Sequence, residues 1–109
     1  MIVLENFTFL SGATSASQGS ELVNIHGESL TLAVDGTFTG SITVQGRQNG
    51  TWFDLQTICL DDLNVYEAIT AGGIYKVIGV DGFDRIRCSL AAISAGSVTV
   101  TGRLCASGT

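Results

Sequence analysis

The chain has 109 residues, of which 45% are hydrophobic and 14% are charged, so it has enough apolar material for the core of one domain and a fully disordered chain is excluded. A net charge of −5 would repel a phosphate backbone, and no apolar run reaches the roughly 18 to 20 residues of a bilayer span. We therefore expect no binding to nucleic acid or membrane. Fourteen glycines and no proline, with frequent Val, Ile and Thr, favour short strands and tight turns.

The chain begins with an apolar segment that is followed by a small, polar one. Residues 2–10 predict a strand that must pack on a sheet edge, either that of its own chain or that of a neighbour. Residues 11–20 are almost entirely Ser, Gly, Ala and Thr, which predicts a flexible arm. We divide the chain accordingly into a strand and arm, 1–20, and a β-sandwich domain, 21–109. The candidate interface residues are the apolar ones of the first strand: Ile2, Val3, Leu4, Phe7 and Phe9.

Eight more short strands are predicted, separated mostly by glycine turns. Asn49-Gly50 is the most secure of the predicted hairpin turns, and residues 60–63 lack helical periodicity and are predicted as a loop. Nine short strands without an intervening helix are typical of an all-β fold, here an antiparallel β-sandwich of the jelly-roll or immunoglobulin-like kind. The eight strands are Leu22 to His26, Ser29 to Val34, Phe38 to Gly46, Thr51 to Ile58, Val65 to Ile69, Ile74 to Val80, Arg85 to Ala91 and Ser97 to Cys105.

No residue pattern predicts catalysis, a cofactor or a metal site. His26 is the one histidine, it lies at a strand end, and no GxSxG elbow presents a serine nucleophile. Asp61-Asp62 with Glu67, or Asp81 with Asp84, could offer oxygen ligands to calcium, but neither set matches a DxDxDG loop. We expect acidic turn residues that bond the local backbone, and no enzyme.

The three cysteines are an odd number without CxxC spacing, so we expect free, buried thiols. Cys88 and Cys105 lie on strands that we expect to be neighbours, and a bridge between them stays open. Arg85 and Arg87 share one face of their strand and could pair with acidic loops such as Asp61-Asp62, within the fold, which we favour, or across an interface.

The aromatic residues leave a second function open. Trp52 follows the Asn49-Gly50 turn and is expected to be a core or edge-of-core anchor. In the alternative interpretation, Trp52 and Tyr75 are exposed platforms that stack on sugar rings, as in a carbohydrate-binding module. Exposed rings would favour the carbohydrate-binding interpretation, and buried rings would favour a packing role.

Residues 36 to 102 carry a succession of turn and strand motifs: GTFTGSITVQG at 36–46, NGTWFDL at 49–55, AGGIY at 71–75, VDG at 80–82, RIR at 85–87 and SAGSVTV at 94–100. This succession is similar to that of small β-sandwich structural proteins of tailed bacteriophages and prophages, in which a DGTxW hairpin is followed by GxYxxxVxG, RVR and SGxVTV strands. Asn49 here replaces the Asp of the family turn, and both arginines of the RVR strand are kept.

The resemblance implies a non-enzymatic virion protein, with a capsid decoration or cement protein favoured and a carbohydrate-binding or adhesion module of a tail, baseplate or head fibre as the alternative. The expected partner is the major capsid protein or another virion protein, and the expected assembly is a homotrimer. The first residues lack the basic start of a signal peptide, so we expect synthesis in the bacterial cytoplasm. Deleting residues 1–20 is expected to abolish capsid binding and leave the sandwich folded.

Overall fold

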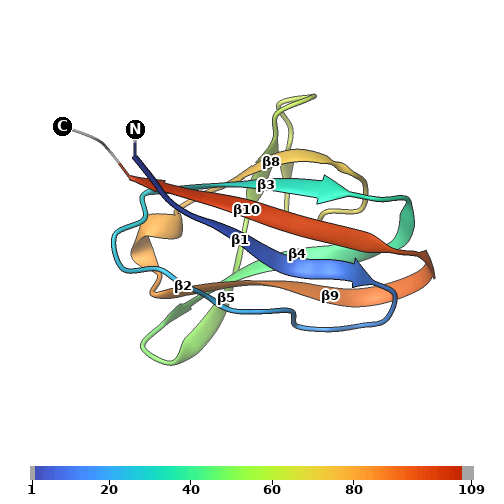
Figure 1. Ribbon diagram of the computed structural model, residues 1–109, viewed down its shortest axis with the longest axis horizontal. Coiled ribbons are helices and arrows are strands. Elements are labelled where there is room, and N and C mark those ends of the chain that lie inside the picture. Colours follow the sequence, from blue (N-terminus) through green and yellow to red (C-terminus); the bar gives the residue numbers. More distant parts are fainter. Residues whose placement is uncertain (1, 107–109) are drawn as a thin grey trace.

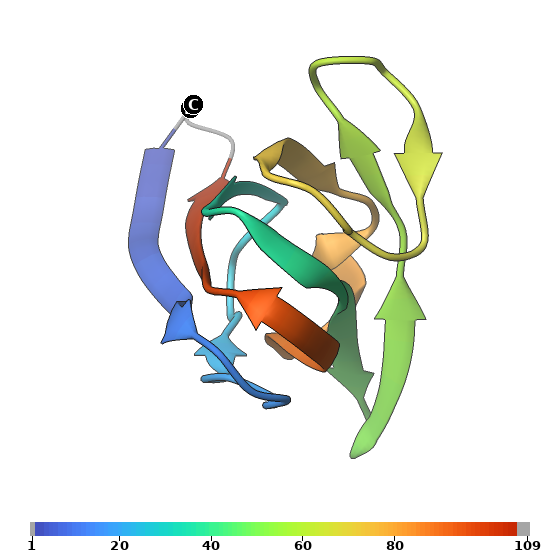
Figure 2. The same cartoon turned by 90° about the vertical axis from the view of Figure 1, so that its right-hand side faces the viewer.

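A computed structural model describes residues 2–106 as two antiparallel β-sheets that face each other, which confirms the predicted all-β sandwich (Figures 1 and 2). Sheet A contains, in spatial order, β1 (Ile2–Ala13), β10 (Val98–Ala106), β3 (Ser29–Asp35), β8 (Gly73–Val77), β6 (Thr57–Cys59) and β7 (Val65–Tyr66). Sheet B contains β2 (Leu22–Val23), β9 (Arg85–Gly96), β4 (Phe38–Gln48) and β5 (Thr51–Leu55). A short 3-10 turn, η1 (Val80–Gly82), precedes β9.

The core lies between the sheets and is built from alternate residues of the long strands. In β3, Leu30, Leu32 and Val34 face inward, while the residues between them lie on the outer face. β4 and β9 provide the opposite wall. The fully buried side chains of the core include Phe9, Leu22, Leu30, Leu32, Ile42, Ile69, Ile86 and Leu90.

The predicted strand Thr51 to Ile58 is two strands that belong to different sheets. β5 ends at Leu55 and pairs with β4, whereas β6 begins at Thr57 and pairs with β8. Leu55, Thr57 and Cys59 all face the core, so the alternation continues while the chain crosses from sheet B to sheet A at Gln56. The prediction of a single strand was wrong because inward and outward residues alternate without interruption through the crossing, so the sequence pattern does not mark the change of sheet.

The predicted strand Leu22 to His26 ends early, at Val23, because the buried side chain of Asn24 begins a turn. Its Nδ2 donates to the carbonyl oxygens of Val80 at 2.9 Å and Phe83 at 3.0 Å, and its Oδ1 accepts from the Gly27 N–H at 2.7 Å. An Asn that bonds the backbone in this way competes with strand pairing. The Asn24 side chain joins the loop after β2 to the segment around η1.

The three cysteines are free and buried, as expected from the sequence. Cys88 lies in β9 of sheet B and Cys105 in β10 of sheet A, so the prediction that they occupy neighbouring strands was wrong. Burial raises the pKa of the Cys88 thiol. The cysteines act as small core residues.

The N-terminal strand packs on its own chain. β1 pairs with β10 from Ile2 opposite Ala106 to Ala13 opposite Val98. Residues 14–21 then run along the sandwich, where Ser17 exchanges backbone hydrogen bonds of 3.0 and 2.7 Å with Leu90. The flexibility predicted for residues 11–20 stays a prediction. The predicted segments 1–20 and 21–109 include Met1 and residues 107–109, which lie outside the described residues.

Candidate interaction site

The outer half of β1 is a free, apolar sheet edge. β1 pairs with β10 on one side, and within residues 2–106 no strand pairs with its other side. Ile2, Val3 and Leu4 are 51%, 44% and 42% exposed. Ile2 and Val3 pair with successive residues of β10 and point to opposite faces, so apolar side chains flank this edge on both faces, and the register with β10 shifts at Leu4.

The inner half of β1 is anchored in the sandwich. Phe9 is 2% exposed and lies in the core, and the Phe7 ring meets the Phe9 ring edge-on with 4.9 Å between centroids. The Ser20 N–H donates to the Phe9 carbonyl oxygen at 3.1 Å, so the following loop covers the strand edge at this point. Among the five predicted interface residues, Ile2, Val3 and Leu4 lie on the surface, Phe7 is half-buried and Phe9 belongs to the core.

The outer face of sheet B carries a network of polar side chains around Trp52. The Arg87 guanidinium carbon lies 3.9 Å from the centroid of the Trp52 ring. Arg87 also donates to Gln45 Oε1 at 2.8 Å and to Gln18 Oε1 at 3.0 Å, and Gln45 donates to Asp54 Oδ1 at 2.9 Å. Trp52 is therefore half-buried on the outer face of the sheet; of the two places expected for it, core or edge of the core, it does not occupy the core.

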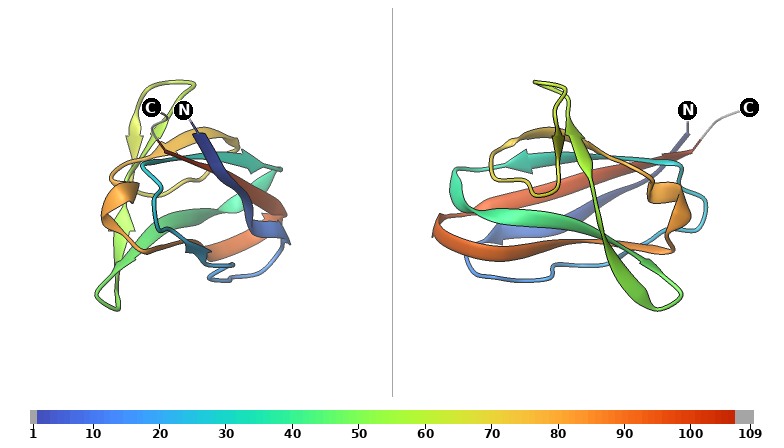
Figure 3. Two further views of the ribbon diagram at one scale, coloured as in Figure 1. Left: turned by 60° about the vertical axis from the view of Figure 1, so that its left-hand side comes forward. Right: turned by 180° about the vertical axis from the view of Figure 1, so that it is seen from behind.

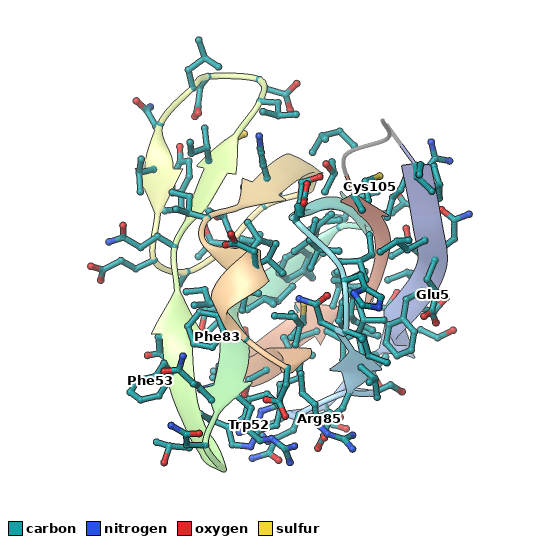
Figure 4. The ribbon with its side chains drawn as sticks, turned by 90° about the vertical axis from the view of Figure 1, so that its left-hand side faces the viewer. Glu5, Trp52, Phe53, Phe83, Arg85 and Cys105 are labelled. Atoms are coloured by element: carbon teal, nitrogen blue, oxygen red, sulfur yellow. The ribbon has the colours of Figure 1, made fainter. Side chains whose placement is uncertain are left out.

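Two ion pairs border this network. Arg47 Nη2 lies 2.9 Å from Asp84 Oδ2, and Arg85 Nη1 lies 3.4 Å from Glu21 Oε1. The hydrogen bond between Arg47 and Asp84 raises the pKa of the arginine and lowers the pKa of the carboxyl. Figure 4 shows Trp52 and Arg85 at the bottom of the view, with Glu5 and Cys105 toward the right.

Asp61 and Asp62 lie in the turn between β6 and β7, in sheet A. The prediction that they pair with Arg85 or Arg87 within the fold was wrong, because both arginines lie on β9 of sheet B, and pairing across an interface stays a prediction. Asp62 instead accepts a hydrogen bond of 2.6 Å from the Tyr66 hydroxyl. This bond lowers the pKa of Asp62 and raises that of Tyr66.

Trp52 and Tyr75 do not form a joint aromatic surface. Tyr75 is 5% exposed on the inner face of β8, and its hydroxyl donates to the Ala71 carbonyl oxygen at 2.8 Å. Burial raises the pKa of this phenol. The alternative interpretation, in which Tyr75 is an exposed platform, was wrong for this residue, since a tyrosine on this inner face fills the core between the sheets.

The candidate catalytic and metal-binding residues are dispersed. His26 is exposed in the loop between β2 and β3, and Asp84 is paired with Arg47. Among residues 2–106, no three His, Cys, Asp or Glu side chains are grouped so that they could hold a metal ion. Within the same residues, no helix is long and apolar enough to cross a bilayer.

A groove that the residue pattern did not indicate lies on the outer face of sheet A. It has a volume of about 470 Å³ and is lined by Asn6, Ser29, Thr31, Ala33, Ile74, Thr101, Gly102, Arg103 and Cys105. Strand pairing places Arg103 and Lys76 on either side of Thr31. Alternation alone predicts that these side chains face outward. Their grouping depends on strand order, which residue periodicity does not give.

A family model described as XepA matches residues 4–104. The chain belongs to the XepA family. The match runs from β1 to β10, so the XepA family region is the whole sandwich. No curated protein sequence matches the chain.

Two solved structures share this fold. The SPBc2 prophage-derived protein YomS is 26% identical and has a TM-score of 0.82, and the match covers 92% of this chain and 90% of YomS. The PBSX exported protein XepA is 22% identical with a TM-score of 0.86, and the match covers 92% of this chain. This chain spans 37% of the length of XepA.

These relatives bear out the phage relationship that the sequence motifs implied. Both structural neighbours are prophage proteins and the chain belongs to the family of one of them, so it is a phage-related β-sandwich protein. The matched residues 4–104 include the anchored half of β1 and the polar network around Trp52 on sheet B.

Proposed function

We propose that the chain is a non-enzymatic structural protein of a phage particle, a capsid decoration protein that binds the major capsid protein across capsomer junctions. The observation that carries this proposal is the free outer half of β1 with exposed Ile2, Val3 and Leu4. The protein is made in the host cytoplasm and acts on the virion, where copies of it assemble as a homotrimer.

The binding mechanism is strand addition. The unpaired side of β1 offers backbone N–H and C=O groups, and a strand of the capsid protein that pairs with them extends sheet A by one strand. The same contact covers the apolar side chains of residues 2–4. Covering three side chains that are about half exposed contributes roughly 3 kcal/mol before the cost of association.

The anchored half of β1 supports this mechanism. Phe9 and Leu10 are held in the core, and Asn6 accepts a hydrogen bond of 3.1 Å from Arg103 Nε on β10. The strand is therefore extended and in place before a partner arrives. Preorganisation of this kind lowers the entropy that binding must overcome.

Co-sedimentation with phage shells that lack the protein tests the proposal. Replacement of Ile2, Val3 and Leu4 by Ser is expected to abolish co-sedimentation and leave the thermal unfolding midpoint nearly unchanged. The matched control replaces Val23 and Ile25, which are exposed in and after β2, and is expected to bind like the parent. Equal binding by the triple variant would refute the strand-addition site.

Trp52 supports a second candidate function, a glycan-binding module of a tail, baseplate or head fibre. Its partly exposed ring lies beside Gln45 and Asp54, the kinds of side chain that hydrogen-bond sugar hydroxyls. Arg87 covers one face of the ring, so a sugar would stack on the opposite face. A glycan array with the parent and with Trp52→Ala tests this role, which requires glycan binding that the variant loses.

A further inference from the structure

The groove on the outer face of sheet A lies where β1, β10, β3 and β8 run side by side (Figures 1 and 3). The side chains that line its middle are small: Thr31 and Ala33 on β3 and Thr101 on β10. Ile74 on β8 and Arg103 on β10 are longer and line it on either side of β3. A hollow of about 470 Å³ is within the range of sites for small organic molecules, roughly 300–1,000 Å³.

One row of cross-strand neighbours makes the groove polar and cationic. Asn6, Arg103, Thr31 and Lys76 pair in succession across β1, β10, β3 and β8. Neighbouring strands are about 4.8 Å apart, so the backbones of Arg103 and Lys76 are separated by about 10 Å. Thr31, which lines the groove, lies between them. A negatively charged group above Thr31 would therefore have a cation on each side.

The adjacent row is mainly apolar. Ala33 pairs with Thr101 on one side and with Ile74 on the other, and all three residues line the groove. Ile74 is 40% exposed, although it is a large apolar side chain. This row lies two residues farther along the strands, about 7 Å from the cationic row. A ligand that covers both rows needs a charged end and an apolar body.

Arg103 is oriented for an anion with two oxygen atoms. Its Nε donates to Asn6 Oδ1 at 3.1 Å, and this bond holds the guanidinium on the side of the groove next to β1. The opposite edge of a guanidinium bonded in this way carries two parallel N–H groups on its Nη atoms. Those two donors match the two oxygens of a carboxylate, whereas a phosphate presents three.

The two cations of this face form no ion pair with a carboxylate of residues 2–106. Both ion pairs of this part of the chain lie on sheet B, where the three arginines of β4 and β9 are engaged in ion pairs or in the Trp52 network. Asp35 lies at the far end of β3, and Glu5 lies in the row of a core residue of β10. The chain carries a net charge of −5, so this face is where an anion meets little repulsion.

We propose that the groove binds a small organic acid, an anion with one carboxylate and an apolar body. The carboxylate accepts two hydrogen bonds from the Nη edge of Arg103 and is attracted by the Lys76 ammonium. The apolar body lies over Ala33 and Ile74. A small molecule fits better than a protein surface, because a specific protein interface covers about 800 Å² on each partner.

This inference goes beyond the proposed function and does not rest on it. The groove lies on the outer face of sheet A, whereas the strand-addition site is the free edge of β1. The test uses the purified full chain without phage shells. Its failure would therefore leave the strand-addition site untouched.

An NMR titration of the ¹⁵N-labelled chain with sodium hexanoate at pH 7 tests the site. Hexanoate should shift the amide signals of Thr31, Ala33 and Gly102 and the Nε–H signal of Arg103, and the shifts should saturate. Hexanamide has the same apolar body without the charge, and acetate has the charge without the body, so each should bind about tenfold more weakly or less well still. No saturable shift with hexanoate, or equal affinity for hexanoate and hexanamide, would overturn the proposal.

Charge variants show which cation carries the binding. Arg103→Gln removes both Nη donors and should weaken hexanoate binding about tenfold or more. Lys76→Gln removes a point charge at an exposed position and should weaken binding about two- to fivefold. The matched control Arg85→Gln removes an equal charge from sheet B and should bind like the parent. Equal affinities for Arg103→Gln and the parent would refute the assigned carboxylate position.

A variant that fills the groove gives an independent check. Residue 33 lies on the outer face of β3, so Ala33→Leu should occupy the apolar floor and keep the thermal unfolding midpoint close to that of the parent. Hexanoate should then shift none of the groove signals. Retained binding by a folded Ala33→Leu variant would place the hexanoate elsewhere and overturn the proposal.

Discussion

The Arg87 guanidinium lies over the Trp52 ring, with 3.9 Å between its central carbon and the ring centroid. The two residues join β9 to the edge strand β5 across β4, so the contact ties three strands of sheet B together. Arg87 adds hydrogen bonds to Gln45 and Gln18. The contact thus holds the edge strand β5 against the rest of sheet B.

Replacing Arg87 by Ala is expected to lower the free energy of unfolding by about 1 to 2 kcal/mol, because the cation–π contact and two side-chain hydrogen bonds are lost. Urea unfolding followed by fluorescence measures this directly, since Trp52 is the single tryptophan. Arg85→Ala, which removes the longer ion pair to Glu21, should lose less. Equal losses in the two variants would argue against a role for the Trp52 contact.

The burial of Phe9 implies that deleting residues 1–20 destabilises the sandwich, whereas the sequence analysis expected the sandwich to stay folded. Because Phe9 and Leu10 lie in the core, a deletion of residues 1–20 removes core side chains as well as the exposed edge. Phe9→Ala should cost about 3–5 kcal/mol of stability by urea denaturation. Phe7→Ala, at a half-buried ring, should cost less, and a stable sandwich after the long deletion would contradict this assignment.

Substitution of Gly50 and of Gly96, which have similar φ angles, distinguishes the cost of a strained backbone from the cost of a steric clash. Gly50 has φ of 78° and Gly96 has φ of 81°, but a Cβ at Gly50 meets nothing within 4 Å, whereas one at Gly96 collides with the Thr37 carbonyl oxygen. Gly50→Ala is expected to cost about 1–2 kcal/mol, the penalty of the left-handed region for an L-residue. Gly96→Ala should cost clearly more, above about 3 kcal/mol by thermal or urea unfolding. Similar losses would show that the β9 to β10 turn relaxes.

The turn at Asn49-Gly50 shows which part of the fold the sequence could predict. Both residues have positive φ, 53° and 78°, which is the requirement that made this dipeptide a secure hairpin signal. The crossing at Gln56 could not be predicted in the same way. Residues on either side of it keep the period of two, and a period of two does not say which sheet a strand joins.

The candidate site was predictable to a similar extent. The apolar run of residues 2–4 indicated a sticky edge, and the structure places these side chains on the free side of sheet A. The burial of Phe9 five residues later could not be read from the sequence, because an apolar run does not say where a strand passes from surface to core. Lys76 and Arg103 come together only through strand order, across Thr31.

Because of the hydrogen bond between Asp62 and Tyr66, the free energy of unfolding should fall both at low pH and at high pH. The pKa of Asp62 is lowered below 3.8 in the folded protein, so its contribution is present above about pH 4 and is lost as the pH falls through the lowered value. The pKa of Tyr66 is raised above 10.0, so its contribution is present below that pH and is lost as the pH rises through the raised value.

Tyr66→Phe removes the hydrogen bond and should weaken both pH dependences at once. Carboxyl-carbon NMR titration should show the Asp62 pKa move up toward its ordinary value in the variant, because the Tyr66 hydroxyl is the largest cause of its depression. The melting temperature of the variant should depend less on pH below pH 4 than that of the parent. Asp62→Asn should have the same effect on this acid dependence, and a parent-like acid profile in both variants would show that other carboxyls control it.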